Sequence, residues 1–480
     1  MFSCKPADDA RPIPHAGCGC CNPQVRSIAR RIDREIGRRG FIAGVGASLT
    51  SLGFARPAKA QPIPPVAFSN FLLFDGNSSA LRGGLRLLVE AGRIKALATG
   101  EFSPPDGART IDCGGRTLMP GLIDAHWHTI FAGLPIPALM TADIGYILLA
   151  ASAEAERTLM RGFTTVRDLG GPAFSLKQAI DEGLAVGPRI YPSGAMITSS
   201  GGHGDLRPLS DLPRGGSPSQ TERTGAVSIA DGADQMRLRV REQLMQGASQ
   251  VKLTASGGVS SPRTTLDMVT LTEAEISAAV EAAADRQAYV TVHAYPREAI
   301  ERAVAVGVQC IEHGHLMDEA TAKLIAEKDV WLSTQPFLSQ EDAAPLTGQS
   351  LRNALRMFEG TKTVYPLARE HRIKTAFGSD LLFSPSLTKR QGVMLTHLQR
   401  WYDNAEILRM ATGVNGELLA LSGPRNPYPG KLGVVEEGAL ADLLVVDGNP
   451  LDDIALMARP ETSLVIIMKD GKVYKDARPA

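Results

Sequence analysis

Cysteine is scarce and poorly placed for cross-linking in this chain of 480 residues. The sequence has six cysteines, and four of them fall within its first 21 residues: Cys4, Cys18, Cys20 and Cys21. Cys113 and Cys310 remain, which are too few for a disulfide scaffold or a thiolate metal site. We therefore expect both to serve as small apolar side chains.

The chain also lacks an excess of charge of either sign, because its formal net charge is zero. The 51 basic and 51 acidic residues cancel, which gives no indication of a nucleic-acid partner. The composition, with 44% hydrophobic and 21% charged residues and no low-complexity tract, is typical of a globular protein. A length of 480 residues exceeds one small domain and suits a large domain with a smaller attached unit.

The first 60 residues differ from the rest, because they contain ten Lys/Arg and only four Asp/Glu. A basic stretch ending in Arg38-Arg39 precedes the weakly apolar text IAGVGASLTSLGF and then Ala58-Lys59-Ala60. This order is typical of an export signal with a cleavage site, and the arginine pair resembles the twin-arginine type. About 13 apolar residues are too few to span a bilayer. We expect a mature chain that begins near Gln61, without membrane attachment, in a bacterial periplasm or outside the cell. The alternative is a basic amphipathic helix, which Pro57 and the Ala-Lys-Ala site disfavour.

Three segments follow this leader. Residues 62–118 and 431–476 both contain alternating apolar residues interrupted by Asp-Gly or Ala-Gly turns, which predicts strands. Neither segment is long enough to fold comfortably alone, so we expect the two to form one small β-sandwich. Between them, residues 119–430 alternate strand-like and helix-like stretches.

This rhythm predicts a (β/α)8 barrel, whose active site lies at the carboxyl ends of its strands. A segment rich in Gly, Ser and Pro, residues 199–224, is expected as a long insertion after the third strand. The predicted strands are 118–125, 164–169, 189–195, 250–254, 289–294, 310–313, 330–334 and 374–378.

Residues able to hold a divalent metal stand at the ends of several of these strands. His126 and His128 are two apart, so strand alternation directs both side chains to one face, as a zinc-binding pair requires. Lys252 lies between Val251 and Leu253, which places a lysine inside the barrel. Burial lowers the pKa of an amine, and a neutral amine can take up carbon dioxide to form a carbamate ligand. The alternative for Lys252 is an ion pair with an inward carboxylate such as Asp124 or Asp168.

His293 and His313 end two consecutive strands, and Asp380 follows the last one in the text AFGSD. Either histidine alone would suggest a hydrogen-bonded core residue, but the pair is suited to a second metal. Asp380 could ligate a metal and also accept a proton from water. Gly378 would let the backbone approach the metal centre closely.

The texts PGLIDAHWH, KLTASGGV, HAYPREAI, IEHGH and FGSD together resemble the amidohydrolase superfamily over nearly the whole chain. They are most similar to its branch of Xaa-Pro dipeptidases or carboxypeptidases and ochratoxin-type amidases. The resemblance implies a binuclear metal centre, with zinc as the expected metal. Lys252 would be its N6-carboxylysine bridge, and the other ligands would be His126, His128, His293, His313 and Asp380.

The resemblance also implies that His203, in the text GGHGD, faces the active site and stabilises an oxyanion. Tyr295 shares the inward parity of His293 and could donate a hydrogen bond to a substrate oxygen. Arg297 could do the same, although an exposed arginine at a helix start is an equally good interpretation. We expect Asp168 to support the metal ligands and His315 to stay outside the ligand set.

The predicted reaction is attack of a metal-bridging hydroxide on an amide bond, with Asp380 moving the proton. The expected substrate is a small molecule with a carboxylate on its leaving amino acid: a dipeptide, an N-acyl amino acid or an ochratoxin-like amide. An esterase or lactonase with the same centre is the alternative within enzymes. A catalytically inactive metal-binding scaffold is the alternative of another class. The resemblance further implies a homo-oligomer.

Overall fold

The structure is a computed structural model that describes residues 64–478 apart from 101–102, 214–216 and 262. The chain divides into two compact units, Met1–Pro62 and Ile63–Ala480, and every element below belongs to the second unit. The predicted export signal at residues 1–60 lies outside the described residues. Among the described helices, none combines the length and apolar character needed to cross a membrane.

The largest sheet has seven strands, and every neighbouring pair in it is parallel. Nearly all residues of these strands are buried, as expected for a parallel sheet covered on both faces. In spatial order the strands are β11 (Val227–Ile229), β10 (Met196–Thr198), β12 (Val251–Thr254), β13 (Val290–Pro296), β14 (Cys310–Leu316), β15 (Trp331–Thr334) and β16 (Thr375–Phe377).

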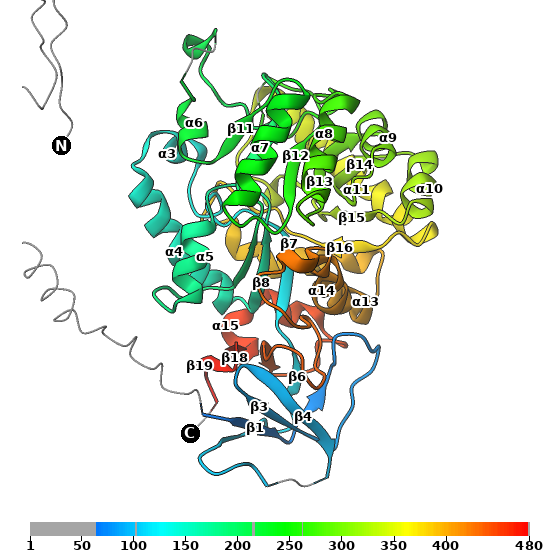
Figure 1. The fold of residues 1–480 in the computed structure, drawn as a ribbon. Helices are drawn as coiled ribbons and strands as arrows, with labels where there is room; N and C mark the ends of the chain where they lie inside the picture. Colours follow the sequence, from blue (N-terminus) through cyan, green and yellow to red (C-terminus); the bar gives the residue numbers. More distant parts are fainter. Residues whose placement is uncertain (1–63, 101–102, 214–216, 262, 479–480) are drawn as a thin grey trace, which may run out of the picture. The chain divides into compact units, whose positions relative to one another are not determined.

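Helices follow most of these strands and pack against one another along the sheet (Figure 1). The best-defined start is that of α8, where Thr272 and Glu275 form a capping box. The helices of this part are α7 (Ala233–Met245), α8 (Glu273–Ala284), α9 (Arg297–Ala305), α10 (Glu319–Glu327) and α11 (Gly348–Glu370).

A second parallel sheet contains β7 (Leu122–Trp127), β8 (Phe163–Asp168) and β9 (Arg189–Pro192), with α4 (Ile144–Met160) and α5 (Phe174–Asp181) between its strands. Backbone hydrogen bonds join it to the larger sheet near both edges. At one edge the amide of Asp380 donates to the carbonyl of His126 (2.8 Å), and at the other the amide of Ser249 donates to the carbonyl of Pro192 (2.8 Å).

The strand predicted for residues 189–195 is confirmed only in part. β9 ends at Pro192, and a separate strand of the other parallel sheet, β10, begins at Met196, beyond the predicted end. Pro192 has no amide hydrogen to continue a ladder, and Gly194 adopts a φ of +73°, which turns the chain between the two strands. The insertion at residues 199–224 therefore follows β10, and it leads through α6 (Gln220–Arg223) into β11.

Strands from the two end segments pair with each other. β17 (Leu443–Val446) lies between β6 (Thr117–Pro120) and β18 (Leu464–Lys469), antiparallel to both. β2 (Leu72–Leu73) and β19 (Lys472–Asp476) complete this five-stranded sheet. A four-stranded sheet comes from the first segment alone: β4 (Arg93–Thr99), β3 (Leu85–Glu90), β1 (Val66–Ser69) and β5 (Arg109–Asp112). One apolar cluster joins residues of both sheets, among them Phe68, Leu87, Leu118, Leu443 and Ile466.

Short helices fill the remaining chain. A π-helical turn, Met410–Val414, leads into α14 (Asn415–Ala420). The Asn415 amide donates to the carbonyls of Ile123 (2.7 Å) and Phe377 (2.8 Å), so one side chain ties β7 to β16. The other helices are α3 (Ile136–Thr141), α12 (Gln391–His397), α13 (Asn404–Arg409) and α15 (Pro460–Ser463).

Candidate metal centre

All six residues predicted as metal ligands line one cavity. They come from the carboxyl ends of strands in both parallel sheets, which is where parallel α/β folds bring side chains together. Five of the six are almost completely buried, and Asp380 is partly exposed. The cavity contains His126, His128, Lys252, His293, His313 and Asp380.

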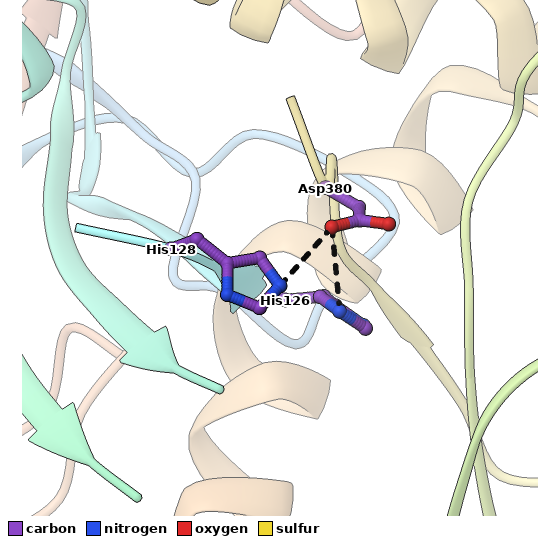
Figure 2. A group of neighbouring side chains, drawn as sticks. All are labelled: His126, His128 and Asp380. Atoms are coloured by element: carbon purple, nitrogen blue, oxygen red, sulfur yellow. Dashed lines mark ion pairs between the residues drawn. The ribbon is translucent and has the colours of Figure 1, made fainter. Parts of the chain in front are cut away.

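His126, His128 and Asp380 form the tightest group (Figure 2). The Asp380 Oδ1 atom lies 3.5 Å from His126 Nε2 and 3.3 Å from His128 Nε2. One ligand atom from each residue falls within 4.8 Å of the other two. Two imidazole nitrogens and one carboxylate at these distances could hold a zinc-like ion.

The two remaining histidines lie beside this group. The His313 ring is centred 4.9 Å from that of His126 and 4.4 Å from that of His293. A hydrogen bond occupies one nitrogen of each: His293 Nε2 lies 2.9 Å from the Gly257 carbonyl, and His313 Nδ1 lies 2.7 Å from Gln335 Oε1. Nδ1 of His293 and Nε2 of His313 thus remain available to a ligand.

Lys252 is 2% exposed, and no hydrogen bond or ion pair of its ammonium is found in the described part of the chain. Asp124, one predicted partner, accepts instead from Ser379, Gln391 and the His126 amide. Asp168, the other, accepts from the amides of Thr129 and Gly170. Burial lowers the pKa of Lys252 to about 8, although Glu312 and Asp380 oppose the shift. The described residues thus show no ion pair between Lys252 and either Asp124 or Asp168.

Burial favours the neutral form of three histidines of the cavity, His126, His293 and His313. It lowers the pKa of His126 to about 4, with a further contribution from Lys252, and holds the pKa values of His293 and His313 well below the usual range. Burial alone would raise the pKa of Asp380, but His126, His128 and Lys252 lower it overall. Neutral imidazoles and an ionised carboxylate are the forms that bind metal.

Close approach and backbone strain accompany this arrangement. A Cβ atom on Gly378 would lie 2.4 Å from His126 Cβ, so only glycine fits there, as the sequence predicted. Two of the six residues have a left-handed backbone, His313 with φ +76° and Asp380 with φ +50°. Such conformations cost about 1–3 kcal/mol each and concentrate at functional sites.

The Amidohydrolase family profile matches residues 117–474. The chain belongs to this family. Ochratoxinase from Aspergillus niger is 29% identical over 435 residues, which cover 84% of this chain and 85% of ochratoxinase. The crystal structure of that ochratoxinase matches with a TM-score of 0.75 at 25% identity, over 86% of this chain and 96% of its own.

Two further solved structures are similar to this amidohydrolase. A prolidase crystallised with N-methylphosphonate-L-proline is 34% identical with a TM-score of 0.79, over 86% of this chain and 100% of the prolidase. A Xaa-Pro dipeptidase with methionine in its active site is 27% identical with a TM-score of 0.74, over 86% and 100% of the two chains. The protein is thus a hydrolase of amide or peptide C–N bonds with an α/β, TIM-barrel-like fold, in the branch that was predicted.

Amidohydrolases generally use two metal ions, and the donors found here fit them. One ring nitrogen of each of His126, His293 and His313 is engaged by a protein group, and the side chains of Asp380 and Lys252 line the same cavity. This is the arrangement expected of metal-binding histidines, whose second nitrogen is held by a carboxylate or carbonyl oxygen.

Three supporting residues of this amidohydrolase were missed from the sequence. Glu312 is completely buried, and its Oε2 lies 2.8 Å from His126 Nδ1 while its Oε1 accepts from Arg167 Nη1 at 2.8 Å. Gln335 bonds His313. Register could have revealed Glu312, because it pairs with His293 across β13 and β14 and so shares a sheet face with it.

The predicted substrate residues His203 and Tyr295 both line the cavity. The His203 ring stacks on His293 with centroids 4.4 Å apart, and its buried Nδ1 has no hydrogen-bond partner among the residues that the structure describes. Tyr295 stacks on His313 at 4.8 Å, and its hydroxyl donates a hydrogen bond to the Met357 sulfur at 3.5 Å. Both side chains thus lie beside the second histidine pair.

Arg297, His315 and the two cysteines do not line the cavity. The Arg297 side chain is 49% exposed and pairs with Asp318, which favours its interpretation as a surface residue. His315 is buried with Nε2 3.0 Å from the Gln335 carbonyl, outside the set of lining residues. Both remaining cysteines, Cys113 and Cys310, are buried with free thiols.

Proposed function

We propose that this amidohydrolase cleaves the amide bond to an amino acid that carries a free carboxylate. Dipeptides, N-acyl amino acids and ochratoxin-like amides all fit this description. The observation that carries the proposal is the convergence of all six candidate ligands with His203 and Tyr295 in one cavity. The names of the similar proteins, a prolidase, a Xaa-Pro dipeptidase and an ochratoxinase, support the same bond type.

We propose two zinc ions held by His126, His128, His293, His313 and Asp380, with Lys252 as a carboxylated bridge. When bound, the metals would supply an activated water and Lewis acidity at the scissile carbonyl. The low exposure and lowered pKa of Lys252 support the carbamate, because carbon dioxide reacts with the neutral amine.

The chain's own residues then perform the proton transfers and the positioning. Asp380 is ionised and accepts the proton of the attacking water, which it returns to the nitrogen of the leaving amino acid. The ring of His203 donates a hydrogen bond to the oxygen on which negative charge develops. The Tyr295 hydroxyl remains protonated, since burial raises its pKa well above the usual range, and it donates to a substrate oxygen.

We infer the following organisation of the chain. Residues 119–430 form the metal-binding (β/α)8 barrel, and residues 62–118 and 431–476 form the composite β-sandwich. The pairing of β6 with β17 and the hydrogen bonds that join the two parallel sheets support this division.

Residues 1–60 act as a twin-arginine-like export signal of a periplasmic or secreted bacterial protein that assembles as a homo-oligomer. Mass spectrometry of the exported protein should place its first residue near Gln61, and Arg38-Arg39→Lys-Lys should keep the protein in the cytoplasm.

A hydrolysis screen tests the function. Metal-loaded protein should cleave N-acyl amino acids or dipeptides faster than aryl esters and lactones of similar size, measured as kcat/KM. Asp380→Asn should keep the fold by circular dichroism but lower turnover by about 10²–10⁴-fold. Preference for esters or lactones would favour the alternative function and overturn ours.

A further inference from the structure

The cavity has two chemically different sides. Next to His128 it is lined by aromatic and aliphatic side chains, which we call the apolar wall: Ile130, Phe131, Leu139, Met140 and Phe383. Beside His293 and His313 lie the polar groups of His203 and Tyr295. A substrate bound at the metal ligands would therefore meet apolar side chains next to His128 and hydrogen-bond donors next to His293 and His313.

The apolar wall is built outward from a metal ligand by stacked rings. The Phe131 ring stacks on His128 with centroids 5.8 Å apart, and Phe383 stacks on Phe131 at 6.2 Å. The amide of Phe383 also donates to the carbonyl of Phe131 (3.0 Å), which fixes the two residues relative to each other. The position of this wall is thus set by the backbone.

Helix α3 (Ile136–Thr141) supplies the outer part of the wall. It has apolar residues at most positions, yet none of them is buried, although Leu139 and Met140 line the cavity. The Gln220 side chain of α6 donates to the Met140 carbonyl (2.7 Å), which anchors α3 over the cavity. Apolar side chains left partly open at a cavity indicate an apolar ligand.

Charge is nearly absent from this lining. Its charged members within the described ranges are Lys252, Asp380 and Asp342, and no arginine occurs among them. Lys252 and Asp380 belong to the metal centre. Asp342 is 1% exposed and already engaged by Arg390 (2.7 Å) and by the amide of Leu338 (2.9 Å). The lining therefore offers no unpaired carboxylate to a positively charged substrate group.

We propose, on the basis of the function proposed above, that the acyl half of the substrate is bulky, apolar and uncharged. The preferred substrates are N-acyl amino acids, and free dipeptides are poor ones. A dipeptide carries its ammonium next to the scissile carbonyl, and burying that charge without a partner is strongly unfavourable. The acyl group lies on the apolar wall, and the carboxylate of the leaving amino acid lies on the side of Tyr295 and His203.

An isosteric substrate pair tests the charge. Leucyl and 4-methylpentanoyl derivatives of the same C-terminal amino acid differ only in the ammonium group. With metal-loaded protein, kcat/KM should be at least tenfold higher for the 4-methylpentanoyl compound. Equal or faster cleavage of the leucyl compound overturns the inference while leaving the proposed function intact. Cleavage of neither compound, nor of any other amide, overturns both.

A chain-length series tests the wall. From acetyl to hexanoyl, kcat/KM should rise by about fourfold for each added methylene, as expected for burial of a CH₂ group. Leu139→Ala and Met140→Ala should each flatten this slope. Leu149→Ala in α4 is the matched control, because Leu149 is 73% exposed and lies outside the lining, and its slope should match the wild type. The proposal is refuted if kcat/KM does not rise with acyl length in the wild type. It is also refuted if the rise for each methylene is unchanged in both Leu139→Ala and Met140→Ala.

Discussion

Replacement of Glu312 by glutamine should weaken metal binding by changing the tautomer of His126. A carboxylate can only accept, so Glu312 Oε2 at 2.8 Å requires a hydrogen on His126 Nδ1 and leaves the lone pair on Nε2. Gln335 Nε2 lies 3.1 Å from the same Nδ1, but it has the Ser333 carbonyl as an alternative acceptor at 3.1 Å. The carboxylate therefore decides which nitrogen of His126 carries the free lone pair that a metal ion needs.

In Glu312→Gln the new amide has one preferred orientation. Its oxygen must face the three donors that now bond Oε1, namely Arg167 Nη1, the Thr291 hydroxyl and the Cys310 thiol. Its NH₂ then faces His126 and donates to Nδ1, which moves the histidine hydrogen to Nε2 and blocks that ligand. Loss of such an orienting carboxylate costs about 10–100-fold in metal affinity, or about 1.4–2.7 kcal/mol.

Glu154→Gln is the matched control. Glu154 is 1% exposed and pairs with Arg161 at 2.8 Å, but it contacts no histidine. Breaking a buried ion pair costs about 3–5 kcal/mol, so both variants should lose stability of this order in urea. Only Glu312→Gln should lose zinc affinity, measured on folded, size-selected protein by competition with a chromophoric chelator. Zinc affinity within about twofold of the wild type in Glu312→Gln would refute the tautomer argument.

Two further predictions concern the same centre. Since burial lowers the Lys252 pKa from 10.5 to about 8, its amine is neutral above about pH 8 when folded but only above 10.5 when unfolded. Metal-stripped protein that is given zinc and bicarbonate should accordingly recover activity faster as the pH rises from about 7 to about 9. Lys252→Ala should recover no activity. A recovery rate that does not change with pH would contradict this expectation. Gly378→Ala places a methyl group 2.4 Å from His126 Cβ, so it should lower the free energy of unfolding by about 1–3 kcal/mol in thermal melts and remove most turnover. The control Gly83→Ala should do neither, because its Cβ would meet only the Leu72 side chain at 3.4 Å. Wild-type stability and turnover in both variants would show that the loop of Gly378 adjusts freely.

The sequence predicts most strands of the parallel sheets, because a buried parallel strand needs little besides an apolar run. The strand predicted for residues 118–125, however, merges β6 and β7, which belong to different sheets. The strand predicted for residues 189–195 is too long, because β9 ends at Pro192 and the chain turns at Gly194, where φ is positive. The candidate ligands could be located because each follows such a run. Their supporting partners were missed, because Glu312 and His126 are 186 positions apart and only the register of β13 against β14 places Glu312 on the side of the ligands.

His313 shows a subtler limit of alternation rules. Glu312 pairs with His293 across β13 and β14, so a regular strand would direct the adjacent His313 to the opposite face. The φ of +76° at His313 redirects the side chain toward the cavity. No periodicity in the sequence encodes this departure, and a histidine is not a residue for which a left-handed backbone would be assumed.

The pairing of β17 between β6 and β18 has a consequence for the order of folding. Leu118 and Val445, which are paired neighbours in this sheet, are 327 positions apart in the chain. During synthesis, the edge of β6 that pairs with β17 therefore lacks its partner until nearly the whole polypeptide has left the ribosome. Contacts of such long range slow folding and expose strand edges meanwhile. We expect ribosome-bound chains that stop before Leu443 to recruit chaperones, and release of the completed C-terminal strands to be the step that ends this exposure.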